Sequence, residues 1–145
     1  MLRQLVLADM DAAAQVHRIA FDAAMPWLAG LHTPDEDRWF YRERIFPACR
    51  VWGWLADDVL SGIIAFRDGW VEQLYVLPLA QGGGGGTALL DLAKSAGERL
   101  ELWTFLRNVP ARRFYEARGF MLVEQTDGAR NEEREPDARY LWSRR

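Results

Sequence analysis

The chemically most informative feature of this sequence is a run of five glycines. The run comprises Gly82, Gly83, Gly84, Gly85 and Gly86. Residues 70–78 before it predict a β-strand that ends at Pro78, and Thr87 with the apolar stretch after it predicts the start of a helix. This order leaves backbone N–H groups free at the positive end of a helix dipole, where they suit the oxygens of a phosphate group. A flexible linker is the alternative that five glycines alone would favour, so the flanking elements carry the phosphate-loop interpretation.

Two other types of phosphate-binding loop do not fit this run. A Walker loop needs a lysine after its last glycine, and Thr87 stands there. A Rossmann fingerprint occupies the first strand-to-helix turn of a parallel sheet. Here three predicted strands joined by tight turns come before the glycines.

The composition bounds the class of protein. A chain of 145 residues predicts a single domain over residues 1–145 with a substantial core. The net charge of −3 gives no general attraction to nucleic acid or to an anionic membrane, so we expect neither as a partner. Cys49 is the only cysteine and His17 and His32 are the only histidines, so we expect no metal site. Without a signal-peptide core or a membrane-spanning apolar run, the sequence predicts a cytoplasmic protein.

The elements that must position the glycine run follow from apolar periodicity and turn residues. The predicted order is βααβββαβαββ, a mixed α/β (α+β) fold whose mostly antiparallel sheet has helices on both faces. A threonine cap, a proline in the first turn and two acidic residues predict that the second helix opens at residues 33–36. The predicted strands are residues 2–9, 49–57, 59–69, 70–77, 99–106, 119–125 and 139–145, and residues 126–138 are a polar surface loop.

Two separated motifs resemble those of the GNAT N-acetyltransferase family. Residues 81–86 fit the family's Q/R-x-x-G-x-G/A signature directly after a strand ending LYVLP. The segment RNVPARRFYEARGF resembles the family's N-xx-A-xx-FYE-xx-GF segment through Asn108, Ala111, Phe114, Tyr115, Glu116, Gly119 and Phe120. The resemblance is specific over residues 70–120 and implies the GNAT fold. It also implies transfer of an acetyl group from acetyl-coenzyme A to a primary amine, by direct attack in a ternary complex.

The resemblance implies which groups hold the cofactor. The N–H groups of the glycine run and of Thr87 would bind the pyrophosphate, while Gln81 stands where many relatives carry an arginine, so one charge contact is absent. A bulge at the end of the strand 70–77 would splay it from the strand 99–106. The pantetheine arm would then pair with the backbone at Leu74 and Val76, and the N–H of Val76 would face the thioester oxygen.

Two residues of the second motif have competing roles. Asn108 would either hydrogen-bond the cofactor arm or cap the helix that follows it. Phe114 would have a packing role, with the same arm as one of its expected partners.

Tyr115 is the expected general acid, because a phenol near the sulfur can protonate the departing thiolate. The alternative is an aromatic residue that only packs the short helix on the sheet.

For the general base, alternation places Glu72 on the same face as Leu74 and Val76, where a partly buried carboxylate would have a raised pKa. The alternative for Glu72 is a solvated or arginine-paired acid. His32 is the second candidate base, since it lies in the loop that forms the acceptor wall in relatives, and His17 is expected to be structural.

The identity of the acceptor is what the sequence determines least. Trp27 and His32 would wall a small-molecule pocket, whereas an open groove would favour a protein N-terminus or lysine. Seven tryptophans could line an aromatic pocket or simply pack the core. Glu132, Glu133 and Glu135 could attract a cationic amine or be solvated. A non-catalytic acyl-coenzyme A sensor is the rival from another class, and a homodimer is possible because many relatives are dimers.

The glycine run contains more glycine than the family signature requires. The signature demands glycine at Gly84 and less strictly at Gly86. The remaining three positions commonly carry side chains in relatives, which predicts a loop that is mobile when empty.

Overall fold

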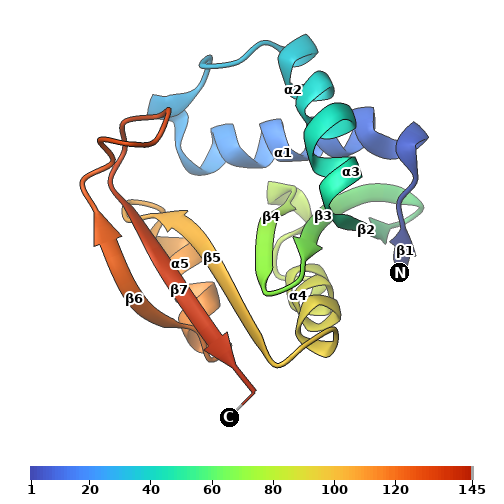
Figure 1. Ribbon diagram of the computed structural model, residues 1–145. Coiled ribbons are helices and arrows are strands. Elements are labelled where there is room, and N and C mark those ends of the chain that lie inside the picture. Colours follow the sequence, from blue (N-terminus) through green and yellow to red (C-terminus); the bar gives the residue numbers. More distant parts are fainter. Residues whose placement is uncertain (145) are drawn as a thin grey trace.

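The computed structural model describes residues 1–144, which form a seven-stranded sheet between helices (Figure 1). The strands lie in the order β1-β2-β3-β4-β5-β7-β6. Their bounds are Leu2–Gln4 (β1), Arg50–Ala56 (β2), Val59–Arg67 (β3), Trp70–Val76 (β4), Arg99–Phe105 (β5), Met121–Thr126 (β6) and Asp137–Ser143 (β7). All neighbouring pairs are antiparallel except β4 and β5. The predicted mixed, mostly antiparallel sheet is therefore confirmed.

Two of the helices in the described part of the chain, α2 and α5, begin at a side-chain cap, at Thr33 and Asn108. Their bounds are Met10–Ala24 (α1), Pro34–Phe40 (α2), Phe46–Ala48 (α3), Gly85–Ser95 (α4) and Val109–Ala117 (α5). At the start of α2, the Thr33 hydroxyl accepts from the N–H of Glu36 at 3.1 Å, and the Glu36 carboxylate accepts from the N–H of Thr33 at 2.7 Å. This is the reciprocal capping box that a threonine followed three residues later by glutamate predicts. Within residues 1–144 no helix is both long and apolar enough to cross a bilayer.

The strand β3 supplies alternate residues to two cores. Ile63 and Ala65 pack with α1 on one face of the sheet, and Ile64 and Phe66 pack with α4 and α5 on the other. All four are buried. Because side chains alternate across a strand, one buried strand holds both helical layers in a fixed relation.

The two central strands β4 and β5 separate almost as soon as they meet. They pair only at Trp70 and Glu101, where the N–H of Glu101 donates to the carbonyl of Gly69 at 2.8 Å. On its other side, β4 pairs with β3 up to Val76, with one extra residue at Glu72. The expected bulge thus lies near the start of β4, and its predicted position at the strand's end was wrong. The predicted splaying is present, and Figure 1 shows the two strands diverging.

Candidate functional site

The glycine run forms a turn that opens directly into α4. Gly82 and Gly84 have φ of 86° and 88°, and Gly84 is the residue that precedes the first turn of α4. Left-handed backbone of this kind favours glycine. The hydrogen bonds formed within residues 1–144 leave the N–H groups of Gly84, Gly85 and Gly86 without a partner. These groups line or adjoin a pocket of about 450 Å³, named here the loop pocket.

Gly85 and Gly86 are fixed by packing as well as by the loop. A Cβ on Gly85 would lie 2.6 Å from Cδ1 of Trp54, which is closer than real side chains approach. A Cβ on Gly86 would lie 3.2 Å from the ring of Phe114. Gly82 requires its positive φ, so two of the three glycines that exceed the signature have a local structural cause. Trp54 lies 31 positions before Gly85 in the sequence, and no motif links the two residues.

A cation lies beside the glycine run that the motif analysis did not identify. Arg118 donates from Nε and Nη2 to the Thr87 hydroxyl oxygen at 2.9 and 2.8 Å. Its guanidinium carbon lies 3.7 Å from the centre of the Phe114 ring, and Nη1 donates to the Phe114 carbonyl at 2.9 Å. Arg118 is the only basic side chain that lines the loop pocket in the described part of the chain. The guanidinium is therefore held rigidly next to the free N–H groups.

Gln81 has a different task from the one its motif position implies. Its side-chain Nε2 donates to the carbonyl of Val76 at 3.0 Å. The side chain thus ties the start of the loop to the end of β4. The positive side chain beside this loop is that of Arg118, which lines the same pocket.

The backbone of β4 presents unpaired groups toward β5. The N–H of Leu77 donates to the carbonyl of Ser61 at 2.8 Å, which makes these two a hydrogen-bonded pair, and Val76 pairs with Gly62 in the next register position. Hydrogen-bonded and non-bonded pairs alternate along an antiparallel ladder. Val76 and Leu74 therefore direct their N–H and C=O groups away from β3, into a groove of about 390 Å³ between β4 and β5. This space is named the β4–β5 groove.

Tyr115 lies where the loop pocket and the β4–β5 groove meet, since it lines both. It is buried on α5 with ring contacts to Phe114, Phe120 and Tyr140. Burial raises the pKa of the Tyr115 phenol above its ordinary range, so the group is protonated at neutral pH. The packing role is confirmed, since Tyr115 packs α5 on the sheet, and the role as general acid stays a prediction that its protonated phenol is consistent with.

The structure shows Asn108 as a helix cap and Glu72 as an arginine-paired acid, which is one of the two roles expected for each. Asn108 lines the groove, and its Oδ1 caps α5 by accepting from the N–H of Ala111 at 3.3 Å. Glu72 is exposed, and its Oε1 accepts from Arg67 at 3.0 Å (Nε) and 2.8 Å (Nη2). The extra residue at Glu72 breaks the alternation on which its expected orientation depended. The structure thus shows an arginine-paired carboxylate and no partly buried base.

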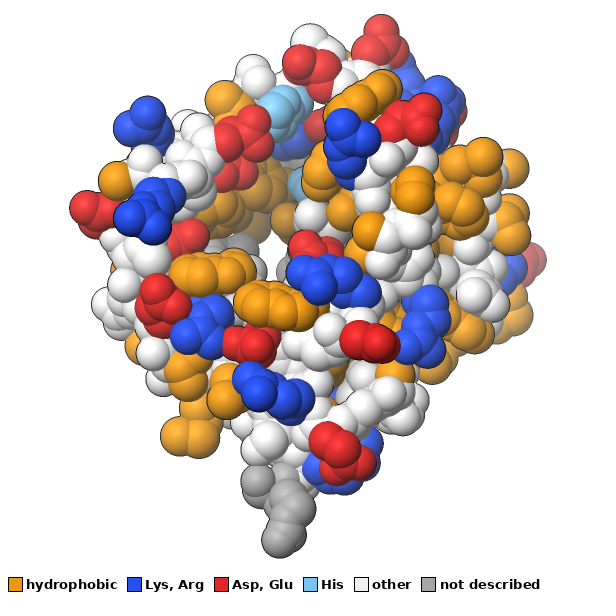
Figure 2. Space-filling model, in the orientation of Figure 1, with side chains coloured by type: hydrophobic (Ala, Val, Ile, Leu, Met, Phe, Trp, Pro, Cys, Tyr) orange, Lys and Arg blue, Asp and Glu red, His pale blue; other side chains and the backbone are white. Residues whose placement is uncertain are grey.

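A second and larger pocket of about 750 Å³ lies beside the groove, between α1, the segment 31–41, β4 and the loop that precedes β7. It is named the α1–α2 pocket. Figure 2 shows it as a hollow with a hydrophobic floor and with acidic and histidine side chains at its edge. Phe21, Gln73, Tyr75 and Phe105 line both this pocket and the β4–β5 groove. The two spaces are therefore adjacent along β4.

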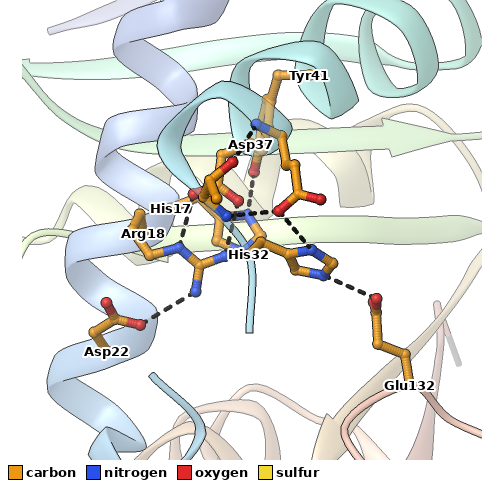
Figure 3. A network of polar contacts seen from close by, with 9 residues as sticks. His17, Arg18, Asp22, His32, Asp37, Tyr41 and Glu132 are labelled. Atoms are coloured by element: carbon orange, nitrogen blue, oxygen red, sulfur yellow. Dashed lines mark hydrogen bonds and ion pairs between the residues drawn. The ribbon is translucent and has the colours of Figure 1, made fainter. Parts of the chain in front are cut away.

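Polar side chains form a network along this pocket (Figure 3). Arg18 donates to both carboxylate oxygens of Asp37 at 2.8 and 2.9 Å, and to Asp22 at 3.1 Å. His32 lies with Nε2 2.9 Å from Glu132 Oε1 and Nδ1 3.8 Å from Glu36 Oε1. The segment after α1 and the loop before β7 are joined by the contact between His32 and Glu132. His32 thus walls the pocket, as predicted.

His17 is buried in the same wall and is structural, as expected. Its ring stacks on Tyr75 with centroids 4.3 Å apart, and Nδ1 lies 2.6 Å from the Tyr41 hydroxyl. Burial lowers the pKa of His17 to about 3, so the imidazole is neutral at pH 7. Burial also raises the pKa of the Tyr41 phenol, so both partners of this hydrogen bond are uncharged at pH 7.

Trp27 does not line the α1–α2 pocket. Its Nε1 donates to Glu135 at 3.2 Å, and the guanidinium of Arg107 lies 4.2 Å from the centre of its ring. Arg107 also donates to both carboxylate oxygens of Glu135, at 2.7 and 2.9 Å. Trp27 and Glu135 therefore anchor the loop before β7, and the predicted acceptor role of Trp27 is not what the structure shows.

Comparisons with known proteins agree with this geometry. The model of the Acetyltransferase (GNAT) family matches residues 14–120. The chain is 32% identical over 74 residues to the Escherichia coli protein named peptidyl-lysine N-acetyltransferase YiaC, a match that covers 50% of this chain and 51% of that protein. The chain thus spans about half the length of this curated relative.

Solved structures share the fold over nearly the whole chain. The solution structure of apo-form YjaB from Escherichia coli has a TM-score of 0.80 at 18% identity, covering 98% of this chain and 96% of that one. The PaiA N-acetyltransferase of Thermoplasma acidophilum in complex with coenzyme A has a TM-score of 0.73 at 19% identity, with coverages of 99% and 98%. YncA of Salmonella typhimurium with acetyl-coenzyme A has a TM-score of 0.71 at 19% identity, with coverages of 99% and 92%.

The packing of Gly85 against Trp54 predicts the effect of a single methyl group. We expect Gly85→Ala to lower the free energy of unfolding by about 1–3 kcal/mol, because the indole must move. Urea denaturation followed by circular dichroism measures this. Gly83→Ala is the matched control, since that position has no positive φ and its Cβ would lie 3.3 Å from one carbonyl oxygen only. Equal losses in the two variants would contradict the packing explanation.

Proposed function

Because this chain belongs to the GNAT acetyltransferase family, we propose that it transfers the acetyl group of acetyl-coenzyme A to a primary amine by direct attack. In this proposal residues 1–145 act as one catalytic domain. The observation that carries it is that Leu74 and Val76 direct backbone groups away from β3, along a groove leading to the glycine run, where only the Val76 carbonyl already has a partner, in the Gln81 side chain. An extended chain can hydrogen-bond to such a strand edge as an added strand.

The residues of the groove and the loop pocket fit the shape and charge of acetyl-coenzyme A. The pantetheine arm would lie between β4 and β5, bonded to the backbone of Leu74 and Val76. The pyrophosphate would accept from the N–H groups of the glycine run and of Thr87, at the N-terminus of α4. Arg118 would supply positive charge at this position, through the N–H groups of Nη1 and Nη2 that its bonds to Thr87 and Phe114 leave over. The ring of Phe114 would hold that guanidinium in place.

The proposed reaction uses two groups of the chain at the reacting centre. The N–H of Val76 donates to the thioester oxygen, where negative charge develops as the amine attacks. A carbon–nitrogen bond forms, the carbon–sulfur bond breaks, and Tyr115 gives its proton to the sulfur. The attacking nitrogen, which enters as a neutral amine, loses one proton to water or to a carboxylate of the α1–α2 pocket. Tyr115 regains a proton from water, so that an amide, a free thiol and a neutral phenol result.

A non-catalytic acyl-coenzyme A sensor is the second candidate. It would need the loop pocket and the groove but no acceptor site. The 750 Å³ pocket adjoining the groove, and a protonated phenol where the two cofactor spaces meet, favour catalysis. YiaC is named as a peptidyl-lysine acetyltransferase, and a lysine side chain is one form of primary amine.

Replacing one oxygen atom tests the role of Tyr115. We expect Tyr115→Phe to lower kcat for acetyl transfer by about 10²-fold or more, because the departing thiolate loses its proton donor. The affinity for coenzyme A should stay within about twofold, since the ring packing is kept. Thiol release measures the first quantity and calorimetric titration the second. An unchanged kcat would exclude the acid role.

Removing the charge of Arg118 tests the phosphate site. We expect Arg118→Gln to weaken coenzyme A binding about tenfold, the order of one charge-assisted contact. The control is Arg113→Gln on the helix α5 that precedes Arg118, because Arg113 is exposed and lines none of the three spaces. Calorimetric titration with coenzyme A compares the two. If both variants bind alike, Arg118 has no part in holding phosphate.

A further inference from the structure

The α1–α2 pocket contains more acids than cations. Its acidic lining residues are Asp35, Glu36, Asp37, Glu132 and Glu133. Its basic ones are Arg18 and the two histidines, of which His17 is neutral because burial lowers its pKa to about 3. A cleft lined by charge of one sign concentrates ligands of the opposite sign. The pocket as a whole therefore favours a cationic ligand.

Four of these acids already have partners in the chain. Asp37 is held by Arg18 at two oxygens, and Asp35 pairs with Arg38. Glu36 and Glu132 lie on either side of His32. The charges of Asp35 and Asp37 are thus compensated by arginines, and Glu36 and Glu132 are engaged with His32, so none of the four is the main attraction for a second cation.

Glu133 differs from its neighbours. It forms no ion pair with a cation in residues 1–144, and it is about half buried. Burial and the nearby charges of Glu132 and Asp137 raise the pKa of its carboxyl group, and its charge also acts on the phenol of Tyr75 across the pocket. A partly desolvated carboxylate of this kind is stabilised by any cation that reaches it.

Aromatic side chains line the part of the pocket that adjoins the groove. Phe21, Tyr75 and Phe105, together with Gln73, line both spaces, and Leu31 and Phe40 add further apolar surface to the pocket. A hydrocarbon chain packs on such a wall, and aromatic faces also tolerate an ammonium group. A ligand could thus place one end at the groove and the other at the acidic side.

We propose that the acceptor is a small alkyl diamine or polyamine, with one amine at the thioester and a second, charged amine held by Glu133. The proposal rests on the proposed function. The acetyl group goes to the first nitrogen as described above, and the second ammonium keeps its proton and forms no covalent bond. The contact of His32 with Glu132 joins two loops beside the pocket, which favours a small molecule over a peptide chain.

Two amines of equal chain length distinguish the effect of the second charge from the effect of the alkyl chain. We expect 1,5-diaminopentane to have a kcat/KM about tenfold or more above that of pentylamine in the thiol-release assay. Glu133→Gln should lower the kcat/KM for the diamine about tenfold and change the kcat/KM for pentylamine by no more than about twofold. Glu98→Gln is the matched control, because Glu98 is exposed and remote from the three spaces, and it should change neither value.

Three results would overturn the proposal. These are equal kcat/KM values for the two amines, an equal loss for both in Glu133→Gln, and a lysine-containing basic peptide used better than the diamine. If no amine releases thiol, the proposed function fails, and calorimetric titration of the coenzyme A complex still tests the pocket. Binding of diaminopentane but not pentylamine, lost in Glu133→Gln, supports the proposal, and absence of that binding contradicts it.

Discussion

The structure depends on the early separation of β4 and β5. In a continuous sheet, the backbone groups of Leu74 and Val76 would bond to β5 and the sheet would have no internal edge. Here the strands meet at one residue pair, so β4 has an exposed edge in the middle of the molecule. Buried backbone groups need partners, and this edge offers them to a ligand. The glycine run, Tyr115 and the α1–α2 pocket are all arranged around it.

In the glycine run, side-chain packing and ligand binding both require residues without a Cβ. The N-terminus of α4 must come close to a ligand, which a backbone without side chains permits. The same helix must also fit against Trp54 and Phe114. Trp54 leaves no room for a Cβ at Gly85, and Phe114 leaves little room for one at Gly86. The ring of Phe114 in turn lies against the guanidinium of Arg118. The loop, the second motif and the sheet are thus coupled through aromatic side chains.

What could be predicted from the sequence is what lies in continuous segments. The order of elements, the threonine cap of α2, the glycine run and Tyr115 each have a local signature. Arg118 contacts Thr87 across 31 positions, and Trp27 contacts Glu135 across 108, so no spacing rule connects them. Glu72 shows a further limit, because one extra residue in β4 changes the face on which alternation would place it. Glu133 is distinguished from Glu132 only by burial and partners, which the sequence does not contain.

The most direct test of the central claim is amide hydrogen exchange at Leu74 and Val76, measured by NMR with and without coenzyme A. The account predicts that both amides exchange quickly in the free protein, since neither donates within the sheet. Bound coenzyme A should slow their exchange by about tenfold or more, while amides already paired with β3, such as that of Tyr75, change little. Slow exchange of Leu74 and Val76 in the free protein, or no protection when coenzyme A is bound, would contradict it.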